Sequence, residues 1–205
     1  MDIKVDVPVG VDGDWAVEKF NITKQQAIFG IMAYGCRAPS AGNYTKLTYK
    51  GRVIMSDTPA EISDHWPVIV EAKGNVLING LGLGMVVQAC LDKTEVDTVT
   101  VVEVEEAVIR LTGAHYQNRY GTRLNIVHGD AYDWVPPKGI RYDVVWHDIW
   151  PDICADNYEQ MKILHRKYGR RSVWQGSWCK DICRRQKLEW DKEKKRNPYI
   201  GRKIL

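Results

Sequence analysis

The chain has 205 residues, 44% of them apolar, with 29 Lys and Arg against 26 Asp and Glu for a formal net charge of +3. This length predicts one domain with a small extension and a sizeable core. No run approaches the ~18 apolar residues that a membrane-spanning helix needs. The N-terminal MDIKVDVPVG carries acids and no long apolar stretch, so we expect neither a membrane partner nor a signal peptide.

Five cysteines, odd in number and scattered along the chain, indicate reduced thiols and a cytoplasmic location. Cys179 and Cys183 would share a helix face, but no His or further Cys lies nearby to complete a zinc site. We therefore expect no metal.

Basic residues gather at the C-terminus, where residues 180–205 hold ten Lys and Arg against four Asp and Glu. Such a region is typical either of a nucleic-acid contact or of a solvated helix face. Acids alternate with the bases here, which favours the solvated face and leaves nucleic acid as a possible partner.

The chain begins with residues 2–22, which we expect to be extended on both sides of a turn at Gly10–Gly13. Thr23 is a candidate N-cap with Gln26 as its capping-box partner, and the helix should end near Gly35. Its predicted inward face is Ala27, Ile28, Ile31 and Met32.

A loop over Ala38–Asn43 should come next, followed by two strands, Tyr44–Tyr49 and Arg52–Met55, that form a hairpin around Lys50-Gly51. A helix should then start at Thr58-Pro59-Ala60-Glu61, where a cap residue precedes Pro at the first helical position. We expect this helix to run through Trp66, with a bend at Pro67, to about Ala72.

The stretch of residues 74–103 is the centre of the pattern, because it predicts a strand, a glycine-rich turn, a helix, a second strand and a terminal acid. Its parts are Val76–Ile78, the glycines Gly80, Gly82 and Gly84, the helix Met85–Leu91, the strand Val99–Val102 and Glu103. Such a βαβ unit brings the turn and the acid to one edge of a parallel sheet, where open α/β sheets bind ligands.

Strands and helices continue to alternate in the rest of the chain. The expected elements are helix Glu105–Tyr116, strand Leu124–Val127, loop Tyr132–Gly139, strand Tyr142–Trp146, helix Asn157–Tyr168, strand Arg171–Gln175, helix Trp178–Lys195 and tail Asn197–Leu205. The alternation predicts an α/β fold with a Rossmann-like, doubly wound, mostly parallel sheet. We expect residues 1–72 to form a small β-hairpin and helix extension, and residues 73–205 to form the ligand-binding domain. No strand follows the fifth, and a homodimer partner could cover the sheet edge left open.

The glycine spacing selects among nucleoside ligands. Glycines permit unusual backbone angles and leave no Cβ to block a ligand. A carboxylate at Glu103 can accept hydrogen bonds from both ribose hydroxyls. A dinucleotide fingerprint needs a third glycine where this chain has Met85 or Val87, depending on the glycine counted first. We therefore predict a nucleoside site that is not a dinucleotide site.

Three further polar residues follow predicted strands. Asp130, with the backbone N–H of Ala131, can hydrogen-bond an adenine, or can simply stabilise the turn after Gly129. Asp148 can orient or deprotonate a substrate, or can serve as a helix cap. His147 is either a base or a side chain that points into the core.

Tryptophans gather near the ends of the fourth and fifth strands, at Trp146, Trp150, Trp174 and Trp178. Their faces can hold a sulfonium or ammonium cation, or stack on adenine, although core packing is the alternative for each. Trp150 is the first candidate for substrate binding because it lies in a loop.

The Gly80-x-Gly82-x-Gly84 turn, with an acid 19 residues after Gly84, resembles motif I and the ribose acid of class I S-adenosylmethionine (SAM)-dependent methyltransferases. Residues 44–155 resemble the spermidine synthase branch of that superfamily. The resemblance implies SAM, or decarboxylated SAM, as the cofactor. It implies contacts to it from Asn79, the three glycines, Glu103, Asp130 and Ala131.

The same resemblance points to Asp148 as catalytic and to Glu61 and Asp152 as substrate-side acids. Leu83 and Pro151 stand where polyamine synthases carry acids, which favours methyl over aminopropyl transfer, since buried ammonium groups must be paired. Three functions remain open: a methyltransferase whose acceptor is not identified, with a small-molecule substrate favoured; an aminopropyltransferase; and a non-enzymatic binding module that uses the basic C-terminus.

Overall fold

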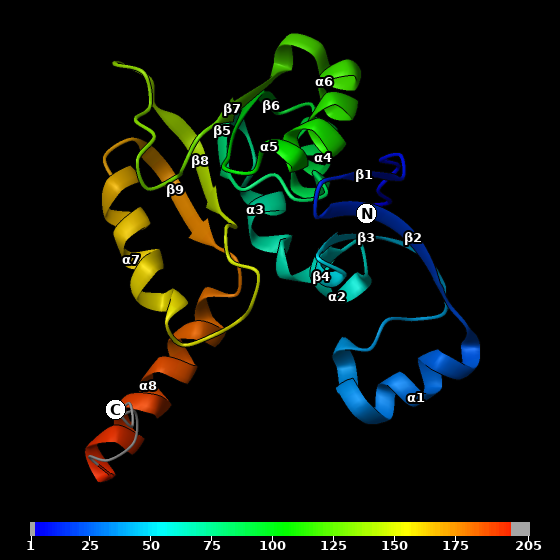
Figure 1. The fold of residues 1–205 in the computed structure, drawn as a ribbon. Coiled ribbons are helices and arrows are strands. Elements are labelled where there is room, and N and C mark those ends of the chain that lie inside the picture. Colours follow the sequence, from blue (N-terminus) through cyan, green and yellow to red (C-terminus); the bar gives the residue numbers. More distant parts are fainter. Residues whose placement is uncertain (1–2, 198–205) are drawn as a thin grey trace.

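A computed structural model describes residues 3–197 and contains two sheets (Figure 1). A four-stranded antiparallel sheet has the order β1-β2-β3-β4, and a five-stranded parallel sheet has the order β7-β6-β5-β8-β9. The predicted α/β fold, with a Rossmann-like sheet and a small N-terminal sheet, is confirmed.

The elements follow the expected order. The first part contains β1 (Gly10–Asp12), β2 (Trp15–Ile22), α1 (Lys24–Tyr34), η1 (Gly35–Arg37), β3 (Gly42–Tyr49), β4 (Arg52–Ser56), α2 (Pro59–Asp64) and α3 (Trp66–Glu71). The second part contains β5 (Gly74–Asn79), α4 (Met85–Leu91), β6 (Val96–Glu103), α5 (Glu106–Val108), η2 (Ile109–Gly113), α6 (Ala114–Tyr120), η3 (Gly121–Arg123), β7 (Leu124–His128), β8 (Tyr142–His147), α7 (Asn157–Tyr168), β9 (Ser172–Ser177) and α8 (Lys180–Arg196).

The parallel sheet is buried on both faces, as its apolar strands require. Val76 and Ile78 of β5 face a core shared with α3, α4 and Tyr116 of α6. Leu77 faces the other way, into a second core with Met161 of α7. This alternation places α7 on one side of the sheet and α4 and α6 on the other (Figure 1).

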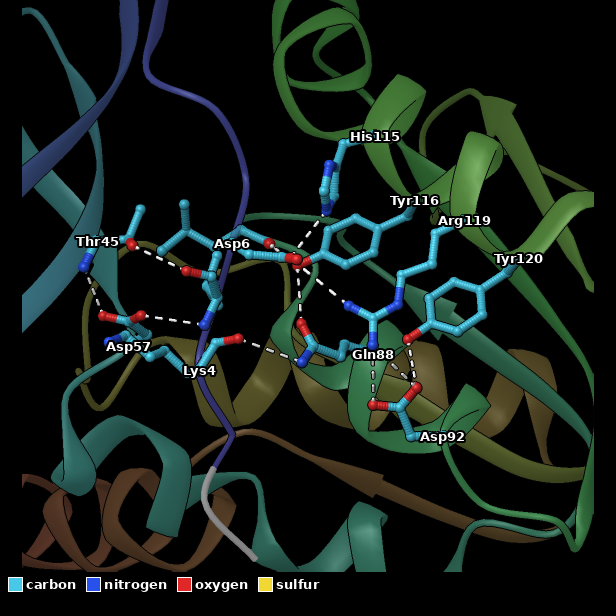
Figure 2. Close-up of polar contacts among 12 residues, drawn as sticks. Lys4, Asp6, Thr45, Asp57, Gln88, Asp92, His115, Tyr116, Arg119 and Tyr120 are labelled. Carbon is cyan, nitrogen blue, oxygen red and sulfur yellow. Dashed lines mark hydrogen bonds and ion pairs between the residues drawn. The ribbon is translucent and has the colours of Figure 1, made fainter.

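The N-terminal segment is part of the larger core. Ile3, Val5 and Val7 are buried in the same apolar cluster as the parallel sheet. The buried carboxylate of Asp57 accepts hydrogen bonds from the backbone N–H of Val5, at 3.2 Å, and from that of Thr45, at 2.6 Å (Figure 2). Both parts of the chain therefore share one core, and the boundary at residues 72 and 73 stays a prediction.

Polar contacts fix the same segment to the helices (Figure 2). The Asp6 carboxylate lies 2.9 Å from Nε2 of His115 on α6. Gln88 of α4 donates from its amide to the backbone oxygen of Lys4, at 3.2 Å. The N-terminal segment is thus held between β3 on one side and α4 and α6 on the other.

The capping box of α1 is confirmed, but its predicted inward face is wrong. Gln26 N–H donates to the Thr23 hydroxyl at 3.2 Å, and the Gln26 side chain accepts from the Thr23 N–H at 2.9 Å. Ile28, Ile31 and Met32 are nevertheless exposed, Met32 by 83%. The reason is placement: β2 and β3 are paired up to their ends, so the helix between them projects from the sheet (Figure 1).

Two other helices differ from the expectation. The helix predicted over residues 58–72 is broken at His65 into α2 and α3. Pro67 lies in the first turn of α3 and has no N–H to continue the preceding helix. The helix predicted to end at Tyr116 continues to Tyr120 through a π-helical turn, η2.

The basic C-terminal helix is confirmed as α8, which extends past the N-terminal end of α7 (Figure 1). The predicted tail falls almost entirely on residues 198–205, outside the described residues. Within residues 3–197, none of the helices has the length and apolar character needed to cross a bilayer. The nucleic-acid and homodimer expectations stay predictions.

Candidate functional site

A cavity of about 650 Å³ lies between the carboxyl edge of the parallel sheet and the N-terminal sheet. Nine of the twelve predicted site residues line it: Glu61, Gly80, Gly82, Glu103, Asp130, Ala131, Asp148, Trp150 and Asp152. The topology explains this convergence, because the ends of adjacent parallel strands meet at one edge.

The glycine turn is held close to the rest of the protein. A Cβ at Gly80, where φ is +98°, would lie 2.0 Å from the Asp148 carbonyl oxygen. A Cβ at Gly84, where φ is +71°, would lie 2.0 Å from the Tyr116 ring. Gly80 therefore lets β5 and β8 approach at the cavity, whereas Gly84 packs against α6 and is outside the cavity lining.

Glu103 connects this turn to the end of β6. One carboxylate oxygen accepts from the Leu81 N–H at 2.7 Å, and the other accepts from the Glu105 N–H at 2.9 Å. Burial raises the pKa of Glu103, and these hydrogen bonds lower it in part. A carboxylate has about four acceptor positions. Glu103 therefore fixes the turn and keeps acceptor capacity on the cavity side.

Asp130 and Ala131 lie side by side at the end of β7. The Asp130 carboxylate accepts from the Tyr132 N–H at 2.7 Å, so the turn-stabilising role is present. The Asp130 side chain is also exposed and lines the cavity. The Tyr168 hydroxyl donates to the Ala131 carbonyl at 2.8 Å, which fixes this backbone for contact with a ligand.

Asp148 is the reactive candidate at the end of β8. Its N–H donates to the Asn79 carbonyl at 2.8 Å, which fixes the loop. Burial, together with the neighbouring Glu61, Glu103 and Asp64, raises the pKa of Asp148 to about 8. Its carboxyl is therefore protonated at neutral pH, and a bound cation would favour its ionised form.

His65 is a site residue that sequence reasoning missed. It is fully buried, lines the cavity, and places Nε2 3.6 Å from an Asp148 carboxyl oxygen. Burial lowers the pKa of His65 to about 4. At neutral pH this contact therefore joins two uncharged groups and is longer than a hydrogen bond. Nothing in the local pattern marks His65, since its position depends on the break between α2 and α3.

The predicted substrate-side residues are all held by other side chains. Glu61 accepts from the Ser56 N–H at 2.7 Å and from its hydroxyl at 2.8 Å, and burial raises the pKa of Glu61. The Trp150 indole donates to Gln160 of α7 at 2.7 Å.

Asp152 forms an ion pair with Arg52 of β4. This pair joins the N-terminal sheet to the loop after β8. Both partners are more than half exposed.

His147 and Asn79 are both fully buried beside the cavity, and neither lines it. The Asn79 amide donates to Nδ1 of His147 at 2.8 Å, and Nε2 lies 3.4 Å from the Gln175 side-chain oxygen. Burial, aided by His165, lowers the pKa of His147 to about 3. This placement favours packing for His147 and does not support a base there, or a ligand contact from the Asn79 side chain.

Two of the four tryptophans also lie away from the cavity. Trp146 and Trp174 stack with ring centroids 6.3 Å apart and do not line it. Trp150 and Trp178 do line it.

The cavity lining is acidic. It contains six carboxyl side chains, those of Glu61, Glu103, Glu105, Asp130, Asp148 and Asp152. Among the described residues that line it, Arg37 is the single Lys or Arg. Both oxygens of Asp64 already accept from that guanidinium, at 2.9 and 2.7 Å. The cavity therefore favours a cationic ligand.

No family model matches the chain. An alignment of 101 positions, which covers 46% of the chain, is 31% identical to a polyamine aminopropyltransferase from Prochlorococcus marinus (strain AS9601). It covers 34% of that protein, so the match spans about a third of the relative's length.

Several solved structures that resemble the chain are described as methyltransferases. A putative RNA methyltransferase from Pyrococcus horikoshii is 19% identical, with a TM-score of 0.45 and 64% of each chain covered. A methyltransferase from Streptomyces caelestis is 20% identical, with a TM-score of 0.44, and 56% of this chain and 46% of that chain are covered. A dimethyladenosine transferase from Plasmodium falciparum is 20% identical, with a TM-score of 0.37, over 45% of this chain and 32% of that chain.

Proposed function

We propose that the protein is a SAM-dependent transferase that moves a methyl group to an acceptor still to be identified. One observation carries the proposal: the glycine turn at Gly80 and Gly82, the Glu103 carboxylate and the Asp130-Ala131 pair all face one cavity. This set provides close backbone approach, an acceptor for ribose hydroxyls and a contact for adenine. The acidic lining also complements the positive charge of a sulfonium.

SAM supplies a methyl group that is already activated, so the protein must mainly hold donor and acceptor in line. Glu103 would hold the ribose, and Asp130 with the Ala131 N–H would hold the adenine. Asp148 would orient the acceptor and take its proton. With a pKa of about 8 this carboxyl is protonated at neutral pH in the free protein, so it would become the base once the bound sulfonium favours its ionised form.

Aminopropyl transfer from decarboxylated SAM is the second candidate, and a specific observation favours it. Burial, together with the nearby Glu61 and Glu103, raises the pKa of Asp148, and such a group of three acids suits an amine acceptor. The matched stretch also belongs to a protein named as a polyamine aminopropyltransferase. Turnover of putrescine with decarboxylated SAM would establish this reaction. If the protein transfers methyl groups but does not turn over putrescine, this reaction is excluded.

The test is a calorimetric titration with SAM, S-adenosylhomocysteine, decarboxylated SAM and methylthioadenosine. It is run on the protein, on Glu103→Ala, and on Glu106→Ala as the control. Glu106 is an exposed acid three residues away that pairs with Arg110 and does not line the cavity. We expect SAM and S-adenosylhomocysteine to bind, Glu103→Ala to lose at least tenfold in affinity, and Glu106→Ala to match the unsubstituted protein. Binding of none of the four ligands would overturn the proposal.

A further inference from the structure

A bulge in the N-terminal hairpin directs Met55 to the glycine turn. The pairing of β3 with β4 shifts between Leu47, opposite Met55, and Thr48, opposite Val53, so Ile54 is the extra residue. Bulges break the normal alternation of a strand and redirect side chains. Ile54 and Met55, although adjacent, both line the cavity.

Met55 makes a direct contact with the turn. The Leu83 N–H donates to the Met55 sulfur, with 3.1 Å between the two atoms. The same sulfur would lie 2.3 Å from a Cβ at Gly82, where φ is +52°. The methionine side chain therefore covers the middle of the glycine turn on the side of the cavity.

The Leu83 N–H is therefore paired with a weak hydrogen-bond acceptor. The Leu81 N–H donates to the Glu103 carboxylate, which is a strong acceptor, whereas a thioether is a weak one. Met side chains have three rotatable bonds and repack at small cost. An oxygen atom of a ligand, above all a carboxylate oxygen, would form a shorter and stronger hydrogen bond with Leu83 than sulfur does.

We infer that Met55 is a removable cap on the Leu83 N–H, and that the carboxylate of the donor's amino-acid tail replaces it. The inference rests on the proposed function and extends it to a residue that determines specificity. Ligands that carry the tail displace Met55, and ligands that lack it leave the cap in place. Met55 thereby sets how strongly the site distinguishes the two kinds of ligand.

The experiment compares S-adenosylhomocysteine with methylthioadenosine, which has the same adenosine and a thioether but no amino-acid tail. Calorimetry is run on the unsubstituted protein, on Met55→Ala, and on Ile54→Ala, the adjacent cavity residue without the sulfur contact. In Met55→Ala we expect S-adenosylhomocysteine to bind about five- to tenfold more tightly, because the ligand no longer has to break the hydrogen bond between Leu83 and the Met55 sulfur. The affinity for methylthioadenosine should stay within about twofold of that of the unsubstituted protein, because a ligand without the tail does not displace Met55. Ile54→Ala should change the two ligands alike. Unchanged or weaker S-adenosylhomocysteine binding in Met55→Ala would overturn the inference.

A second measurement is made on the unsubstituted protein, so it does not depend on a truncated side chain. With ¹³C-methyl methionine labelling, the Met55 signal, assigned from Met55→Leu, should shift on saturation with S-adenosylhomocysteine and stay in place with methylthioadenosine. An unmoved Met55 signal with S-adenosylhomocysteine bound would overturn the inference while leaving the proposed function intact. Failure of both ligands to bind the unsubstituted protein would overturn the proposed function and the inference together.

Discussion

Single residues determine whether the turn at the cavity can form. Gly80 and Gly13 both have positive φ, at +98° and +59°, but only Gly80 has a neighbour where a Cβ would lie. We expect Gly80→Ala to lower the free energy of unfolding by about 3 kcal/mol or more, because the Asp148 backbone must move. Gly13→Ala should cost about 1 kcal/mol, the backbone strain alone. Urea denaturation measures both, and equal losses would mean that the close approach at Gly80 is not needed.

Asp148 also makes stability depend on pH. Its folded pKa, about 8, is above that of an unfolded aspartic acid, so the folded state binds this proton more tightly. The stability from that proton is present below pH 4 and is lost as the pH rises to 8. Asp148→Asn should therefore match the unsubstituted protein in Tm near pH 4, exceed it by about 10 °C at pH 9, and be inactive. A Tm difference that does not change with pH would contradict the raised pKa.

At the scale of elements, the N-terminal segment depends on one buried acid. Asp57→Ala would leave the N–H groups of Val5 and Thr45 without their acceptor. We expect a loss of about 2–4 kcal/mol in unfolding free energy, with faster hydrogen exchange at Val5. Asp14→Ala is the control, since its ion pair with Lys50 is exposed and should contribute under about 0.5 kcal/mol. Equal effects of the two substitutions would show that the segment is held by its apolar side chains alone.

Sequence patterns predicted elements well where local signals agree. The helices Met85–Leu91 and Asn157–Tyr168 begin and end at the residues expected. Local signals failed where tertiary placement decides. The pattern of α1 predicts a buried face, but no element of the described chain covers it. Thr58 is the N-cap of α2, as predicted, but its hydroxyl lies 3.1 Å from that of Ser56 and makes no capping hydrogen bond.

At the scale of the whole molecule, one ion pair joins the two sides of the cavity. Arg52 and Asp152 are both more than half exposed, so Arg52→Ala should change unfolding free energy by no more than about 1 kcal/mol. The pair connects β4 to the loop after β8, and its loss should speed dissociation of S-adenosylhomocysteine about threefold or more. Stopped-flow dissociation tests this, with Lys50→Ala, at the hairpin tip, as the control. Equal dissociation rates would show that the pair does not retain the ligand.

The arrangement of the two sheets explains which site residues the sequence could predict. Glu103, Asp130 and Asp148 follow strands of one parallel sheet, so topology alone brings them to one edge. His65 and Met55 come from segments whose position depends on how the N-terminal sheet packs against that edge. No spacing in the sequence encodes that packing, which is why the acidic edge was predicted and the opposite wall was not.

The cavity wall from the N-terminal sheet has a consequence for how such a protein can diversify. The glycine turn and its acids lie between residues 80 and 148, whereas the apolar wall comes from Trp15, Leu47, Tyr49, Ile54 and Met55. Mutations can therefore change the two walls of the cavity separately, because the walls come from different segments of the sequence. On the proposed function, we expect exchanges at Tyr49 or Ile54 to alter the acceptor preference, whereas an exchange at Met55 would also alter donor binding through its contact with Leu83.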